Sequence, residues 1–284
     1  MDVRQLLQKV NEMRVLVLGS EGQIGKPLCI HLEEQGHHVR HWDKVISKSQ
    51  NLADPEYYGE LCVEMHMADK VIFLAFEVGG SKFLAKADKN FEYIDENVSL
   101  MCHTFAALKY TKTPFLFASS QMANMHHTNY GFLKDLGERY TRSLGGWICR
   151  FWNVFGVEEC EEEKLHVITD FLLKAQQGKI EMRTTGTESR QFLHTEDCSR
   201  ALESWVDGEW DDRTQYYDIT SFEWVSILDV AKTVQGIVGG EVVPGEKEDT
   251  LQRGIKNPPS EYIRKFWEPD LSLEEGIKMV YYNL

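Results

Sequence analysis

Three glycines that follow a short apolar run near the start of the chain constrain its fold more than any other feature. The run Val15 to Leu18 is typical of a strand that is buried on both faces of a parallel sheet. Gly19, Gly22 and Gly25 come next, and the apolar spacing beyond them indicates a helix that begins inside the glycine run. The chain therefore has to turn tightly from a strand into a helix N-terminus.

Such a helix N-terminus favours a bound pyrophosphate, because free N–H groups and the helix dipole stabilise negative charge and glycines leave room for its approach. The spacing is GxxGxxG rather than GxGxxG, so the context has to support this interpretation. A second predicted strand, 37–42, ends on Asp43, 18 positions after Gly25, where an acidic residue would meet ribose hydroxyls. The Asp43 carboxylate favours NAD over NADP, whereas Arg40 and Lys44 favour the phosphorylated cofactor.

Composition narrows the function classes. The chain has 284 residues, 42% of them hydrophobic and 27% charged, which is typical of a globular protein. A net charge of −14 argues against nucleic acid and anionic membranes as partners. Residues 1–13 lack the apolar core of a signal peptide or membrane span, and we expect a short helical lead-in there. The six cysteines include no CxxC pair, so we expect no metal site, no disulfide framework and a cytoplasmic location.

Strands and helices alternate up to residue 156. After the first two strands, further strands are expected at 71–76, 114–120 and 147–156, and long helices at about 82–110 and 130–144. Asp54 is expected to cap a helix whose first residue is Pro55. The alternation predicts an α/β fold with a doubly wound parallel sheet, in which ligands bind beyond the carboxyl ends of the strands. Several glycine and polar residues fall at those ends: Gly19, Gly79, Ser119, Ser120 and Asn153.

The second half is less regular. The expected elements are a helix at 167–177, a strand at 180–183, a strand and a helix within 191–206 capped by Thr195 or Glu196, and a final helix within 271–282. The charge run from Glu158 to Lys164 is interpreted as a solvated loop. No Gly/Ser-rich linker separates this half from the first. We therefore expect a nucleotide-binding domain at 1–156, to which 191–220 return, and a smaller substrate-binding region at 157–190 and 221–284.

Tyr130 and Lys134 lie four residues apart on a predicted helix, so their side chains share one face. The pair carries little information alone, but here it follows a glycine turn and Ser120 at a strand end. A nearby ammonium lowers the pKa of a phenol, so Tyr130 can take a proton from a substrate alcohol while the carbon gives hydride to NAD. Asn97 is interpreted either as a polar packing residue or as a group that bonds backbone and water beside Lys134.

A series of motifs runs along nearly the whole chain: GSEGQIG, Asp43, FLAFEVGG, FASS, YGFLK with Glu138, RFWNVFG, RQFLHTEDCSRAL and LSLEEGIK. In this order they resemble the extended short-chain dehydrogenase/reductase family, which comprises NAD-dependent nucleotide-sugar epimerases and dehydratases. The resemblance implies a Rossmann sheet, NAD as the cofactor and a nucleotide diphosphate sugar, linked to GDP, UDP or dTDP, as the substrate. It also implies a homodimer formed by the two long helices, whose apolar faces could instead be used within the sheet.

The resemblance assigns roles residue by residue. Ser120, Tyr130 and Lys134 match the catalytic triad. The implied cofactor residues are Gly19, Gly22, Gln23, Ile24, Gly25, Asp43, Asn51, Leu52, Leu74, Ala75, Asn97, Tyr130 and Lys134. The implied substrate residues are Gly80, Ser119, Gln121, Asn153, His166, Arg190 and Arg253. Arginines suit the bidentate recognition of a diphosphate. The alternative for Arg190 is a surface ion pair with Glu188 or Glu196.

The departures from the family are informative. Gln121 and Met122 stand where its dehydratases place acidic residues, and an amide cannot deliver a proton, so a 4,6-dehydratase is disfavoured. His126 and His127 are either an acid/base pair or exposed loop residues. YGFLKDLGE and EEKLHVITDF resemble relatives in bacterial surface-polysaccharide pathways that act on GDP-linked heptoses or hexoses.

The expected activity is NAD-dependent oxidation of a sugar hydroxyl, at C4, of a nucleotide-linked hexose or heptose. The net reaction is epimerisation if the 4-keto sugar turns over in the site before the hydride returns to it. It is dehydrogenation if the keto product leaves. Two other classes stay open. One is a catalytically silent NAD-binding regulatory protein, and the other is an NADP-dependent keto-sugar reductase, which Asp43 opposes.

Overall fold

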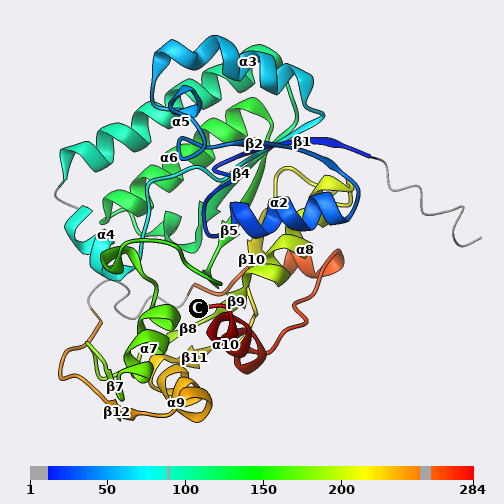
Figure 1. Cartoon of the computed structure of the whole chain (residues 1–284). Coiled ribbons are helices and arrows are strands. Elements are labelled where there is room, and N and C mark those ends of the chain that lie inside the picture. The colour runs from blue at the N-terminus through cyan, green and yellow to red at the C-terminus, as the bar shows by residue number, and fades with distance from the viewer. Residues whose placement is uncertain (1–11, 88–89, 250–256) are drawn as a thin grey trace, which may run out of the picture.

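A six-stranded parallel sheet forms the centre of the protein (Figure 1), in a computed structural model that describes residues 12–87, 90–249 and 257–284. Its order is β10-β5-β4-β3-β1-β2. The strands are β1 (Arg14–Leu18), β2 (His38–Trp42), β3 (Lys70–Phe73), β4 (Phe115–Ser120), β5 (Trp147–Phe151) and β10 (Tyr216–Ile219). The predicted doubly wound parallel sheet is thereby confirmed. The direction of winding reverses between β1 and β3, which is where such a sheet opens a crevice for a ligand.

The two faces of the sheet carry separate apolar cores, because successive side chains of a strand point to opposite sides. Val15 and Val17 of β1 join one core, and Leu16 and Leu18 join the other. Helices α2 (Gly25–Glu34) and α8 (Thr195–Val206) contribute to the first core. Helices α3 (Tyr58–Met67), α5 (Phe91–Thr111) and α6 (Asn129–Leu144) contribute to the second.

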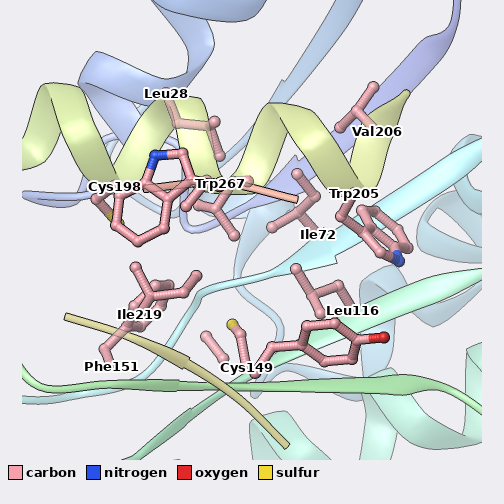
Figure 2. Close-up of a cluster of buried hydrophobic side chains, with 14 of the residues drawn as sticks. Leu28, Ile72, Leu116, Cys149, Phe151, Cys198, Trp205, Val206, Ile219 and Trp267 are labelled. Atoms are coloured by element: carbon pink, nitrogen blue, oxygen red, sulfur yellow. The ribbon is translucent and has the colours of Figure 1, made fainter. Parts of the chain in front are cut away.

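Figure 2 shows the first core, where Leu28 of α2 and Trp205 of α8 lie over Ile72 and Leu116 of the sheet. Cys149 of β5 is also buried there, and burial raises the pKa of its thiol. This cysteine is therefore a small apolar residue of the core and not a nucleophile.

Two expected elements are each divided. The long helix expected at 82–110 consists of α4 (Ser81–Ala87) and α5, because the side chain of Asn90 accepts a hydrogen bond from the Tyr93 amide, at 3.3 Å, and caps a new helix. The strand expected at 147–156 leaves the central sheet after β5. Its continuation, β6 (Asn153–Phe155), pairs instead with β9 (Phe192–His194).

The caps are partly as predicted. Asp54 caps the turn Pro55–Tyr57 by accepting from the Glu56 amide at 3.0 Å, as expected. The predicted cap of α8 is wrong, because His194 is the N-cap residue in place of Thr195 or Glu196. The Nδ1 atom of His194 accepts a hydrogen bond from the Glu196 amide at 3.3 Å. Short 3-10 turns complete the connections at Lys48–Gln50, Gln121–Asn124, Glu162–Lys164 and Glu261–Lys265.

The remaining elements gather below the sheet in Figure 1 and form a third apolar core. They are α7 (Val167–Gln176), α9 (Ile227–Val238), α10 (Leu273–Tyr282) and the strand pairs β7 (Lys179–Glu181) with β12 (Glu241–Val243) and β8 (Ser189–Arg190) with β11 (Val225–Ser226). Ser272 and Glu275 form a capping box at α10. Within the described ranges, none of the helices has the length and apolar character to cross a bilayer. Most of the expected N-terminal lead-in lies outside those ranges.

Candidate active site

Two cavities meet at the carboxyl edge of the sheet. The first has a volume of about 260 Å³ and lies on the glycine turn between β1 and α2; we call it the glycine-turn cavity. The second has a volume of about 270 Å³ and lies between the sheet edge and α7; we call it the α7 cavity. The wall that they share is made of Val78, Ser120, Tyr130, Trp152, Val154 and His166.

Close backbone packing builds the glycine-turn cavity. A Cβ atom on Gly25 would lie 2.1 Å from the Gly19 carbonyl oxygen, so only glycine lets α2 start against the end of β1. Gly19 itself has a φ of +88°, and a Cβ there would lie 2.7 Å from the Ala75 nitrogen. Among the residues that the structure describes, no side chain caps the N-terminus of α2. Gln23 lines the cavity, and its buried amide nitrogen has no partner in the described part of the chain. These features suit a pyrophosphate.

Asp43 lies in the wall of the same cavity, where its carboxylate accepts from the amides of Glu21, at 3.1 Å, and Val45, at 3.0 Å. The two neighbouring cations have carboxylate partners of their own. Arg40 pairs with Glu64 at 2.9 Å, and Lys44 pairs with Glu96 at 2.9 Å. The local charge therefore suits ribose hydroxyls better than a 2′-phosphate. The other implied cofactor residues in this wall are Gly22, Ile24, Asn51, Leu52, Leu74 and Ala75.

Tyr130 and Ser120 face both cavities. The Tyr130 hydroxyl is hydrogen-bonded to Ser120, and Ser120 also accepts from the Met122 amide at 3.1 Å. Gly131 makes this arrangement possible, because a Cβ there would lie 2.4 Å from the carbonyl oxygens of Met122 and Met125. Burial raises the pKa of Tyr130 to about 12, while the Ser120 hydrogen bond lowers it. The phenol is therefore neutral until positive charge comes close.

Lys134 lies one helical turn beyond Tyr130, and its ammonium donates to the Ala118 carbonyl at 2.8 Å. Burial lowers the pKa of Lys134 to about 7, against the opposing influence of Cys149 and Glu138. Its Nζ atom lies 5.7 Å from the centre of the Tyr130 ring. Ser120, Tyr130 and Lys134 thus converge beside the glycine-turn cavity, which all three line.

The α7 cavity gathers substrate residues from distant segments. Gly80, Gln121, Asn153, His166 and Arg190 all line it. Arg190 donates to its neighbour's carbonyl, that of Ser189, at 2.8 Å, and forms an ion pair with Asp249. Asp249 also lines the cavity, so this is a different partner from the Glu188 or Glu196 expected for a surface pair. Arg253 lies outside the described residues.

His166 sits at the N-cap of α7 and bonds to Glu158 through both its backbone amide and its Nδ1 atom. The side chain of Glu158 is only 3% exposed, so the interpretation of this charge run as a solvated loop is wrong at its first residue. Burial raises the pKa of Glu158, but the hydrogen bonds and charge of His166 outweigh it and hold that pKa below its ordinary value. No sequence signal pairs residues eight positions apart in a loop.

Two predicted site groups line neither cavity, and the hydroxyl of a third is engaged by a neighbouring side chain. Ser119 lines the glycine-turn cavity, but its hydroxyl donates to Glu138 at 2.6 Å. Asn97 is fully buried and lines neither cavity, and its side-chain amide is hydrogen-bonded to the backbone of Glu77 and Tyr93. His126 and His127 are exposed and line neither cavity, which agrees with their interpretation as loop residues.

Sequence reasoning missed several cavity residues. Lys82 lines the α7 cavity and follows Ser81 and the Gly79-Gly80 pair in the sequence. Its Nζ atom lies 3.3 Å from Oδ1 of Asp170. Arg183 lines the same cavity. Phe76 lines the glycine-turn cavity. Lys82 carried a signal, because a cation beside a glycine pair at a strand end is a candidate for phosphate binding, whereas Arg183 and Phe76 carried none.

A family model described as the NAD dependent epimerase/dehydratase family matches residues 15–204. The chain belongs to this family. The recognition made from the motifs is thereby confirmed, and with it the prediction of an NAD-dependent enzyme. The close packing at Gly19 and Gly25 and the unpartnered amide of Gln23 show that the residues present fit this cofactor.

A curated relative is GDP-L-fucose synthase of Sinorhizobium fredii, which is 30% identical over 125 residues. That match covers 41% of this chain and 39% of the relative, so the chain is aligned with less than half of the relative's length.

Solved structures cover nearly the whole chain of this epimerase/dehydratase family member. Epimerase Mth375 of Methanothermobacter thermautotrophicus superposes with a TM-score of 0.81 at 20% identity, over 96% of this chain and 92% of its own. UDP-glucose 4-epimerase of Thermotoga maritima, solved with UDP-glucose, gives 0.77 at 18% identity, over 95% and 98%. WbmF of Bordetella bronchiseptica, solved with NAD+ and UDP, gives 0.79 at 20% identity, over 96% and 92%. These likenesses confirm the Rossmann-like fold.

Proposed function

We propose that the protein oxidises a ring hydroxyl, at C4, of a nucleotide-linked hexose or heptose, with NAD in the glycine-turn cavity and the nucleotide sugar in the α7 cavity. One observation carries the proposal. Ser120 and Tyr130 stand in the wall that the two cavities share, so a group in either cavity can reach them. NAD, when bound, supplies the hydride acceptor.

The chain's own residues move the proton. Tyr130 accepts the proton of the sugar hydroxyl, and Ser120 holds the same oxygen by a hydrogen bond. A phenol with a pKa of about 12 is a poor base at neutral pH, so the reaction needs positive charge beside it. Lys134 lies one turn away on α6 and supplies that charge.

The diphosphate is held by cations of the α7 cavity. Arg190 presents a planar guanidinium that suits a diphosphate, and Asn153 and Lys82 lie in the same wall. The protein as a whole has a charge of −14, so a dianionic group needs such local cations. Exchange of Asp249 for the diphosphate as the partner of Arg190 would accompany binding. Ser119 is left out of the proposed substrate set because its hydroxyl is bonded to Glu138.

The pair of Glu158 and His166 favours epimerisation over release of a keto product. Glu158 holds Nδ1 of His166, which leaves Nε2 without a partner in the described structure and places the imidazole in the wall of both cavities. An imidazole oriented by a buried carboxylate is suited to act as a general acid or base. It would remove and return a proton on a carbon next to the 4-keto group and so invert that neighbouring carbon, which is a different route from the return of hydride to C4 and a step that simple dehydrogenation does not use.

The test is to incubate the purified protein with UDP-, GDP- and dTDP-linked sugars, following the absorbance of reduced cofactor and the sugar NMR spectrum. Oxidation or epimerisation of one sugar, lost in Tyr130→Phe, supports the proposal. NAD binding without any change in any sugar would favour the catalytically silent alternative. In D2O, deuterium on a sugar carbon marks proton exchange; it should vanish in His166→Asn and persist in His126→Asn, a control at an exposed histidine.

We further propose a homodimer in the cytoplasm. The apolar side chains Phe132, 53% exposed, and Phe91, 71% exposed, lie on α6 and α5, the helices expected to pair. Six free thiols suit a reducing compartment. Light scattering should give twice the chain mass at micromolar concentration, and Phe132→Asp should give the monomer. A wild-type monomer would contradict the dimer.

A further inference from the structure

Phe76 sits at the meeting point of Tyr130 and Lys134. The centre of its ring lies 3.7 Å from Nζ of Lys134, and the ring meets that of Tyr130 edge-to-face with the centres 5.8 Å apart. Phe76 also lines the glycine-turn cavity. One apolar side chain thus touches both of the groups that the proposed proton transfer needs.

The backbone holds this ring in place from both sides. On one side, the amides of Leu74 and Ala75 both donate to the Leu18 carbonyl, at 2.9 and 2.8 Å, which ends β3 early and ties the loop to β1. On the other side, Asn97 clamps Glu77, whose amide donates to Asn97 Oδ1 at 2.9 Å. Phe76 stands between these two clamps, so its position is determined by the fold and not by a flexible loop.

The Lys134 ammonium lacks a carboxylate partner. Among the described residues it forms no ion pair, and its hydrogen bond goes to the Ala118 carbonyl. The charged or titratable groups that face it are Tyr130 and Glu138 on α6 and Cys149 on β5. Burial disfavours its charged form and lowers its pKa to about 7. The face of an aromatic ring attracts a cation, and this attraction is strongest where water is excluded.

We propose that Phe76 is a positioning residue that holds the Lys134 ammonium against its ring face, so that the lysine stays charged and beside Tyr130. The inference rests on the proposed role of Lys134 in proton transfer. Phe117, whose ring centre is 5.3 Å from the same Nζ, is a more distant second ring. We therefore expect the charged state of Lys134 to depend on the negative charge at the face of the Phe76 ring, rather than on the volume of that ring.

The test replaces Phe76 by fluorinated phenylalanines, which weaken the negative face of the ring and keep its shape. The pKa of Lys134 is measured by NMR in protein carrying 13Cε-lysine, with the signal assigned by its absence in Lys134→Met. Pentafluorophenylalanine at position 76 should lower this pKa by about one unit, with partly fluorinated rings in between. Phe76→Leu should lower it by a similar amount, and Phe76→Tyr should preserve it.

Phe83 provides a matched control. Its ring centre lies 5.2 Å from Nζ of Lys164 and 5.9 Å from the Tyr93 ring, which reproduces the lysine and tyrosine contacts of Phe76. Fluorination at position 83 should leave the pKa of Lys134 unchanged. If the pKa of Lys134 does not change when the ring at position 76 is fluorinated, the inference is overturned, even if a sugar is oxidised. If the pKa of Lys134 falls as the ring at position 76 is fluorinated but no sugar is oxidised, the inference is supported and the proposed function fails.

Discussion

The two cavities are built in different ways. Backbone contacts between neighbouring segments form the glycine-turn cavity, in which Gly19 lies too close to the backbone of Ala75, and Gly25 too close to that of Gly19, for either glycine to be replaced by a residue with a side chain. Side chains from distant segments form the α7 cavity, where Arg190 meets Asp249 and His166 meets Glu158. A cavity made of backbone suits one constant ligand, whereas a cavity made of ion pairs changes with each substitution. This difference supports the proposal that the first binds the cofactor shared by the family and that the second determines the substrate.

The largest effect is expected at the shared wall. Tyr130→Phe removes the hydroxyl that takes the substrate proton, and it should lower turnover about 1000-fold, within the range of general base catalysis. NAD and nucleotide binding should change little, because the ring remains between Phe76 and Ser120. Steady-state kinetics and calorimetric titrations measure both quantities. Turnover close to that of the wild type would show that the two cavities do not share a catalytic residue.

A smaller effect should separate the cavities. Gly25→Ala brings a Cβ to within 2.1 Å of the Gly19 carbonyl oxygen, and the turn has to open. NAD affinity should fall about 100-fold, since the amides at the helix N-terminus move away from the pyrophosphate. Nucleotide diphosphate binding in the α7 cavity should persist. Gly59→Ala on α3 is the control, because a Cβ there meets nothing within 4 Å.

The reverse separation is expected at Arg190. Arg190→Lys removes the planar fork and should weaken the binding of a nucleoside diphosphate about tenfold, as expected for the loss of one charge-assisted hydrogen bond. NAD affinity should stay within twofold, since Arg190 does not line the glycine-turn cavity. Arg213→Lys, whose guanidinium lies 4.0 Å from the centre of the Trp147 ring and lines neither cavity, is the control. An equal loss of both ligands would contradict the division of roles.

The smallest effect concerns stability and pH. Lys134 has a pKa of about 7 in the folded protein, against an ordinary value of 10.5, because burial disfavours its charge. Between these values the unfolded chain binds more protons, so the contribution of Lys134 to the free energy of unfolding rises with pH. Relative to Lys134→Met, the wild type should gain about 1 kcal/mol between pH 7 and pH 8. Urea unfolding of both proteins at each pH measures this gain. The prediction would be contradicted if the free energy of unfolding changed with pH by the same amount in both.

The accuracy of sequence reasoning follows the same division. Strand β1, the glycine turn and Asp43 depend on neighbours within one βαβ unit, so their spacing was informative. The break between α4 and α5 was missed because the apolar spacing continues through Asn90, whose capping bond decides the boundary. The branch from β5 to β6 was missed because Asn153 pairs with Phe192, far along the chain.

The chain's own order of residues determined the sheet, the cofactor and the family, because the short contacts of a strand, a turn and a helix are encoded in adjacent positions. The tertiary structure alone decided the partners of the buried polar groups. It paired His166 with Glu158, joined Ser119 to Glu138, and set the ring of Phe76 against Lys134. Such pairings depend on how separate segments pack, and no local spacing specifies that packing.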